Sequence, residues 1–158
     1  MGSIYRRYRR NSPEAVARVV ASLLIGDDRI APRELDFMDR AGMFSIIGVE
    51  RHLFMRIASE LIGEIRRDRE TALDPRRVRD ERFDAALDAI EDRDQQNLVS
   101  AVLVYLAAAD SNLDEEGKAL VRHVFQRWNV SAETLEREFN VPRRRTRPYV
   151  AANRAAAE

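Results

Sequence analysis

Two short acidic loops, each between two stretches with the apolar spacing of helices, constrain the fold of this chain more than any other feature. The first begins at Asp27 and the second at Asp110, 83 residues later. The same offset aligns Leu23 with Leu106, Met38 with Val121, Ile47 with Val130, and Glu50 with Glu133. Leu35 falls opposite Lys118 and does not match. Similarity at one offset indicates two copies of a unit that cannot bury its apolar face alone, so we expect one compact domain made of two pseudo-symmetric copies.

The first copy, residues 12–66, contains three segments with helical spacing of apolar residues. Its first helix begins at Ser12, a typical N-cap that is followed by a proline. A second helix opens at Pro32 and ends near Gly42. Residues 44–48 are expected to form a loop that leads into a long third helix.

The second copy, residues 83–139, follows a charged connector, residues 67–82, in which Asp74-Pro75 starts a new helix. The stretch 98–109 is apolar on nearly every face, so we expect a helix there that is buried at the centre of the bundle. Ser131 begins a short last helix. No segment alternates with a period of two. The sequence therefore predicts an all-α fold of about seven helices.

Composition favours one cytoplasmic domain. A chain of 158 residues with 45% hydrophobic residues is long enough to bury a core and too apolar to be disordered. The absence of cysteine excludes thiolate metal sites, cysteine nucleophiles and disulfides, and fits a reducing compartment. The longest nearly uncharged stretch, 98–109, is shorter than the roughly 20 residues of a membrane-spanning helix, and no signal-peptide pattern follows Met1.

The formal net charge of zero hides a separation of charge along the chain. A basic arm, residues 1–11, and an Arg/Ala-rich tail, residues 140–158, flank a body with 18 basic and 26 acidic residues. We expect the tail to be flexible. The arm and the tail are either solvated and folded back on the acidic body, or they bind the anions of a membrane surface or a nucleic acid. The candidate anion-binding residues are Arg6, Arg7, Arg9, Arg10, Arg143, Arg144 and Arg145.

Carboxylates gather in and just after both acidic loops, and Ca²⁺ and Mg²⁺ prefer such hard oxygen ligands. The candidate metal ligands are Asp27, Asp28, Glu34, Asp110, Asp114 and Glu116. The second loop resembles the start of an EF-hand, but Glu115 replaces the required glycine and Val121 the bidentate glutamate, which excludes a standard EF-hand. The simpler alternative, compatible with the first, is that these acids cap helix N-termini and satisfy turn amides.

Nothing in the sequence assembles a reaction centre. There is no nucleophile motif, phosphate-binding glycine loop or HExxH helix. His52 and His123 are isolated in sequence, so a zinc site would require them to converge, and we expect them at ordinary helix surfaces or boundaries. We predict that the protein is not an enzyme and that a divalent cation, Ca²⁺ or Mg²⁺, is its only candidate cofactor.

The apolar helix, the Asp-x-x-Ile/Leu loop, the acidic helix start and the second copy together resemble the TerB-like family. This family comprises the tellurite-resistance protein B domain and a related region of DjlA-type co-chaperones, and the resemblance covers roughly residues 13–139. The family loop is approximately Asp-Gly-x-Ile-x-x-x-Glu. Asp27, Ile30 and Glu34 match it in the first copy, and Asp110 and Leu113 match in the second. Asp28 replaces the first glycine, and Gly117 stands at the second glutamate position, one residue after Glu116.

The resemblance implies an all-helical fold with pseudo-twofold repeats and acidic surface residues that bind metal ions. It also implies a role in bacterial stress or tellurite resistance, next to membrane-associated partners and therefore at the periphery of the inner membrane. We accordingly expect a non-enzymatic module that binds a divalent cation or a protein partner through the acidic loops. A second copy of the chain is a further candidate partner. The alternative is binding to a membrane surface or a nucleic acid through the arginine-rich ends.

Overall fold

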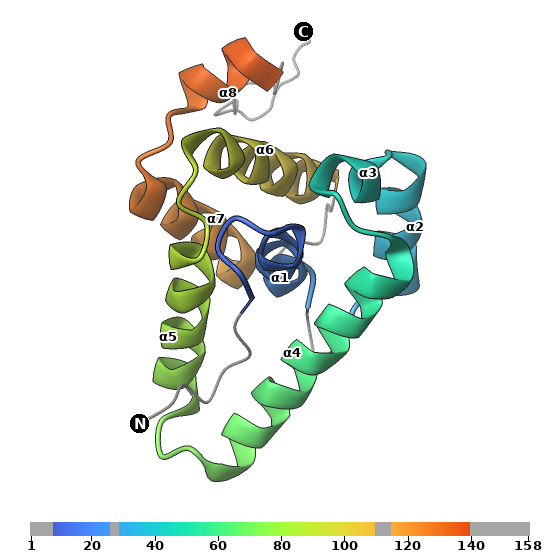
Figure 1. Cartoon of the computed structure of the whole chain (residues 1–158). Coiled ribbons are helices and arrows are strands. Elements are labelled where there is room, and N and C mark those ends of the chain that lie inside the picture. The colour runs from blue at the N-terminus through green and yellow to red at the C-terminus, as the bar shows by residue number, and fades with distance from the viewer. Residues whose placement is uncertain (1–7, 26–28, 110–114, 140–158) are drawn as a thin grey trace, which may run out of the picture.

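The computed structural model describes residues 8–25, 29–109 and 115–139, which form eight helices and no strand (Figure 1). The helices are α1 (Pro13–Leu24), α2 (Pro32–Arg40), α3 (Met43–Ile47), α4 (Arg51–Thr71), α5 (Pro75–Asp88), α6 (Arg93–Ala109), α7 (Glu115–Trp128) and α8 (Ala132–Phe139). The predicted all-α fold is confirmed. The two-copy organisation stays a prediction: α7 begins 83 residues after α2, but α2 has 9 residues and α7 has 14.

The central helix of the fold is α1. Figure 1 looks nearly along α1 and shows it enclosed by α4, α5, α6 and α7. Every residue from Ala15 to Ala21 is buried. The expectation that 98–109 occupies the centre is only partly right, because Tyr105, Ala108 and Ala109 are exposed on α6. The small side chains of α1 explain the difference, since alanines among its valines let helices approach it closely on several sides.

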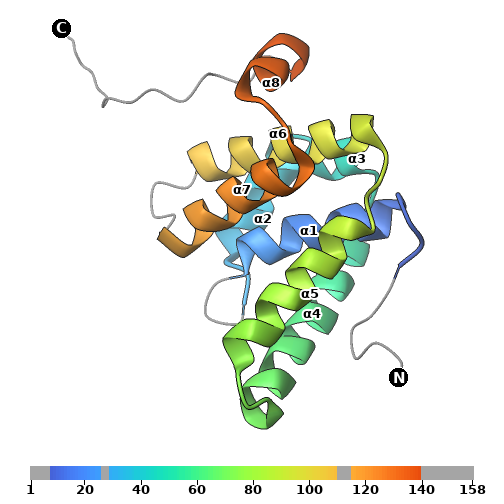
Figure 2. The same ribbon diagram turned by 90° about the vertical axis from the view of Figure 1, so that its left-hand side faces the viewer.

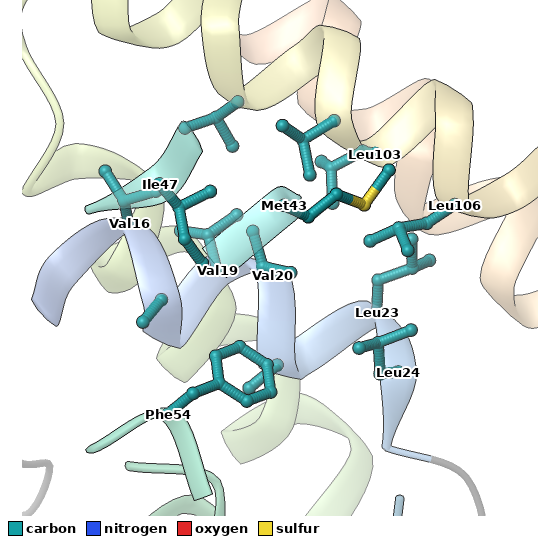
Figure 3. Close-up of a cluster of buried hydrophobic side chains, with 14 of the residues drawn as sticks. Val16, Val19, Val20, Leu23, Leu24, Met43, Ile47, Phe54, Leu103 and Leu106 are labelled. Carbon is teal, nitrogen blue, oxygen red and sulfur yellow. The ribbon is translucent and has the colours of Figure 1, made fainter. Parts of the chain in front are cut away.

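The main hydrophobic core lies between α1, α3, α4 and α6 (Figure 3). Val16, Val19 and Val20 of α1 face the short helix α3, and Phe54 of α4 packs beneath them. Phe54 is fully buried and meets the ring of Phe44 edge to face, with the centroids 5.4 Å apart. Such a pair contributes packing energy beyond the burial of its area.

The predicted loop at residues 44–48 is wrong, because Met43–Ile47 form the helix α3. Met43, Phe44 and Ile47 are buried, and their spacing places all three on one side of a single helical turn. Gly42 and Gly48 flank the turn with φ angles of 71° and 83°, a left-handed conformation that glycine adopts without strain.

Helices α4 and α5 form a hairpin whose turn projects from the rest of the molecule in both views (Figures 1 and 2). The predicted break lies where expected, since Asp74 is the N-cap of α5 and its Oδ1 accepts a hydrogen bond from the N–H of Arg77 at 3.2 Å. The segment 67–82 is otherwise helical, so it forms the end of α4 and the start of α5.

Helix α8 starts as the sequence predicts, because Ser131 Oγ accepts a hydrogen bond from the N–H of Thr134 at 3.1 Å. Leu135 is buried on the inner side of α8, against the core that includes Val130. The N–H of the Trp128 indole, at the end of α7, donates to the carbonyl of Leu87 on α5 at 3.3 Å. These contacts hold the last two helices against the body.

Candidate functional site

The two helices that precede the acidic loops, α1 and α6, pack against each other (Figure 2). At their amino ends, Gln95 donates a hydrogen bond to the carbonyl of Asn11 at 2.8 Å. At their carboxyl ends, Leu23 lies next to Leu106 in the core (Figure 3). The two helices cross obliquely, and their carboxyl ends lie on the same side of the molecule (Figures 1 and 2).

Of the six candidate metal ligands, the structure places two. Glu34 Oε1 accepts a hydrogen bond from the N–H of Ala31 at 3.2 Å, as expected of an acid that caps the start of α2. Glu116, in the first turn of α7, forms ion pairs with Arg79 and with Arg76 of α5, the latter at 3.9 Å. Both glutamates therefore have structural partners: Glu34 caps its helix, as the capping alternative predicts, whereas Glu116 pairs with arginines of a neighbouring helix.

The other four candidate ligands, Asp27, Asp28, Asp110 and Asp114, lie outside the described residues. Among the residues that are described, no three His, Asp or Glu side chains gather in a way that would hold a metal ion. The prediction of a Ca²⁺ or Mg²⁺ site in the loops therefore stays a prediction.

Only the end of the basic arm is described, and it lies against the body. The hydroxyl of Tyr8 donates to Glu60 Oε1 at 2.7 Å. Arg10 forms an ion pair with Glu91 and donates to the carbonyl of Asp88 at 3.4 Å, and both Arg9 and Arg10 are exposed. At these positions the contacts favour an arm folded back on acidic residues. The remaining candidate anion-binding residues, Arg6, Arg7, Arg143, Arg144 and Arg145, lie outside the described residues.

The two histidines lie on different helices with different partners. His52 is exposed at the start of α4, with Nε2 3.7 Å from a carboxylate oxygen of Glu50. His123 is half exposed on α7, where Nε2 lies 2.6 Å from Asp84 Oδ1 and the ring stacks loosely against Phe83. The expectation of ordinary surface and boundary histidines is confirmed.

A row of ion pairs connects α5 to α7 beside His123. Arg127 of α7 binds both oxygens of Asp88 at 2.9 and 3.0 Å and lies 3.7 Å from Asp84. Arg79 and Glu116 extend the row toward the start of α7. These side chains are all substantially exposed, so the row orients α7 on α5 but adds little stability per pair.

Four charged residues are buried together where α1, α4 and α5 meet, and none of them is among the predicted site residues. Arg18 of α1 binds Glu64 of α4 through two hydrogen bonds, at 2.6 and 3.2 Å. Arg82 of α5 forms an ion pair with Asp68 of α4, and its Nε lies 3.4 Å from Glu64 Oε1. All four residues are less than 9% exposed. We call them the buried ionic cluster; its charges balance, which a group of buried ions requires.

A signal for this cluster exists in the sequence. Glu64 and Asp68 continue the buried stripe of α4 at helical steps after Ile57 and Leu61, so they fall on the face that points inward. Arg18 likewise interrupts the apolar residues of α1. Charged residues on an otherwise apolar stripe indicate a buried pair more often than an isolated charge, because an unpaired buried ion is too costly.

Comparisons with protein-family models, with curated proteins and with solved structures find no match to this chain. The fold and the positions described above thus define an all-helical domain, and the TerB-like resemblance stays a prediction from the sequence. Across the described part of the chain, no helix is long and apolar enough to cross a membrane.

Proposed function

We propose that this protein is a non-enzymatic, TerB-like helical module that binds a divalent cation or a basic protein surface through its two acidic loops. Its physiological setting is a bacterial stress response of the tellurite-resistance type. The observation that supports this proposal is the packing of the carboxyl-terminal part of α1 against that of α6, which brings Leu23 next to Leu106 (Figure 3). Each acidic loop follows one of these helices in the sequence, and the helix ends that lead into the two loops lie on the same side of the molecule.

In the metal-binding form, four candidate ligands remain, because Glu34 and Glu116 already have structural roles. They are Asp27 and Asp28 of the first loop and Asp110 and Asp114 of the second. Four carboxylates offer oxygen ligands of the kind that Ca²⁺ selects, with water completing the coordination. In the partner-binding form, the same carboxylates attract a basic surface, and salt weakens that attraction.

An amide NMR titration of the full chain with Ca²⁺ and Mg²⁺ tests the metal-binding form. We expect saturable shifts at residues that border both loops, such as Leu24 and Ala109, and loss of these shifts in Asp27→Ala and in Asp110→Ala. Asp94→Ala is the matched control, because Asp94 is an exposed acid at the opposite end of α6. Shifts that persist in both loop variants, or that vanish equally in the control, would contradict this form.

The same spectra, recorded with a polyarginine peptide in place of the ion, test the partner-binding form. Salt-sensitive shifts at Leu24 and Ala109 that disappear when Asp27 and Asp110 are both replaced by alanine support it. If neither the ions nor the peptide shifts the amide signals of Leu24 and Ala109, the proposal is rejected. Binding of anionic vesicles or RNA that is lost on deletion of residues 1–7 and 140–158 would instead assign the function to the arginine-rich ends.

A further inference from the structure

The turn of the α4–α5 hairpin carries an apolar side chain that no other part of the described structure covers. Leu73 is 106% exposed, compared with 49% for Ile46 and 39% for Tyr105, the other large hydrophobic residues at the described surface. It lies between the end of α4 and the N-cap of α5, at the point where the hairpin projects farthest from the body (Figures 1 and 2). A leucine in this position is the first apolar group that an approaching surface meets.

Basic side chains surround this leucine. Five exposed arginines occupy the last turns of α4 and the first turn of α5: Arg66, Arg67, Arg69, Arg76 and Arg77. Two of them also pair with acids of α5 and α7, Arg77 with Glu81 at 3.2 Å and Arg76 with Glu116 at 3.9 Å. Two exposed acids, Glu70 and Asp74, accompany them, and one oxygen of Asp74 already accepts the N–H of Arg77. The third acid of this region, Asp68, is buried against Arg82 and contributes nothing to the surface charge. The exposed tip is therefore positive.

The base of the hairpin is held firmly. The buried ionic cluster ties α4 to α5 through Arg82 and to α1 through Arg18, only one or two turns from the tip. The tip is thus a fixed projection, and the backbone that carries Leu73 and the arginines is positioned before any partner binds. Such preorganisation reduces the entropy lost on binding.

We propose that the tip of the α4–α5 hairpin docks on an anionic membrane surface, with Leu73 entering the lipid interface and the arginines binding lipid phosphates. An arginine fork matches phosphate oxygens with two hydrogen bonds, and basic residues are attracted to an anionic leaflet. A protein partner would require a wider apolar surface than one leucine. A nucleic acid would leave Leu73 in water. One protruding leucine surrounded by arginines fits a lipid interface. There the leucine can enter the apolar region while the arginines stay at the level of the lipid phosphates.

Vesicle flotation of the full chain tests this proposal, with phosphatidylcholine vesicles compared to phosphatidylcholine–phosphatidylserine vesicles. We expect binding only to the anionic vesicles, and roughly tenfold weaker binding for Leu73→Ser because the leucine no longer leaves water. Replacement of Arg66 and Arg67 by glutamine should weaken binding by about fivefold per charge. Because these side chains are exposed, the variants should keep the helical content of the wild type, which circular dichroism verifies.

Matched controls lie near the other end of α4. Ile46→Ser makes the same kind of apolar-to-polar change on α3, and Arg33→Gln with Arg40→Gln makes the same change of charge on α2. If Leu73 and its neighbours form the docking surface, neither control should alter vesicle binding by more than about twofold. That change would come from the long-range effect of net charge. Equal weakening by the controls would overturn the proposal.

A fluorescence measurement distinguishes insertion from adsorption. With anionic vesicles, the emission of Leu73→Trp should shift to the blue, whereas that of Ile46→Trp should not, and the buried Trp128 supplies a constant background in both. Three results would overturn the proposal: no vesicle binding by the wild type, unchanged binding by Leu73→Ser, or arginine-dependent binding to RNA without any dependence on Leu73. The tip and the acidic loops belong to different elements, so this test and that of the proposed function fail independently.

Discussion

Replacement of Arg18 by methionine probes the buried ionic cluster directly. Methionine keeps a long unbranched side chain, so the main loss is the charge and its two hydrogen bonds to Glu64. The side chains of Arg18 and Glu64 are 4% and 8% exposed, so water cannot replace the lost partner. Removal of one member of a buried pair typically costs 3–5 kcal/mol. We expect about 3 kcal/mol, the lower end, because Arg82 Nε remains 3.4 Å from Glu64.

Urea unfolding followed by far-UV circular dichroism measures this loss, and thermal unfolding should show a midpoint lower by about 6–12 °C. A second substitution makes the test specific. Glu64→Gln removes the uncompensated negative charge in the Arg18→Met background and leaves Arg82 and Asp68 as a balanced pair. The double variant should therefore be more stable than Arg18→Met by about 1 kcal/mol, although each single variant is less stable than the wild type.

Arg51→Met is the matched control, because Arg51 makes two comparable contacts in water, with Asp39 at 2.9 Å and Asp36 at 3.2 Å. Hydrogen bonds to Asp39 and Asp36 raise the pKa of Arg51 above its ordinary value, yet water solvates all three groups when the pair is broken. Its loss should change stability much less than the loss of Arg18. The reasoning is refuted if the two variants are equally destabilised, or if Glu64→Gln recovers no stability in the Arg18→Met background.

Three further substitutions test the helix ends and the core. Phe54→Ala should destabilise the fold by about 3–5 kcal/mol, since Phe54 is fully buried against Phe44, and a loss below 1 kcal/mol in urea unfolding would contradict this packing. Ser131→Ala should cost about 1 kcal/mol through loss of the cap on α8, with Ser131→Asp retaining stability in the same assay. Gly48→Ala should lower the thermal midpoint because the φ of 83° strains a residue with a Cβ, even though Pro13 leaves that Cβ room; an unchanged midpoint would argue against this conformation.

The sequence predicts most of this fold because the helix signals are local. Proline and a capping side chain start α1 and α5, and Ser131 starts α8, so the boundaries follow from chemistry within one turn. The helix α3 is too short for a helical periodicity to show in the sequence, although Met43 and Ile47 lie one turn apart. The central position of α1 was missed for a different reason. Periodicity reports which face of a helix is apolar, but not how many neighbours a helix with small side chains accommodates.

The candidate site is harder to predict from the sequence than the helices are, because it depends on which segments meet in space. The structure assigns Glu34 to a local contact at the start of α2, which helix-start preferences alone could predict. Glu116 instead pairs with Arg79, a residue 37 positions earlier on α5. The convergence of α1 and α6, and the partnership of Arg18 with a residue 46 positions later, require the tertiary arrangement. A sequence pattern can show that a buried charged residue requires an oppositely charged partner, but only the tertiary structure shows which residue that partner is.

The central position of α1 also determines when this protein can fold during its synthesis. Helix α1 ends at Leu24, whereas α6, which covers one of its sides, begins at Arg93, 69 residues later. At a translation rate of about 5–20 residues per second, α6 begins to emerge roughly 3–14 s after α1. During that interval the valines and leucines of α1 have no complete core to enter. The first helix that the structure describes is thus among the last to be fully covered, and until then the growing chain exposes apolar residues that could aggregate.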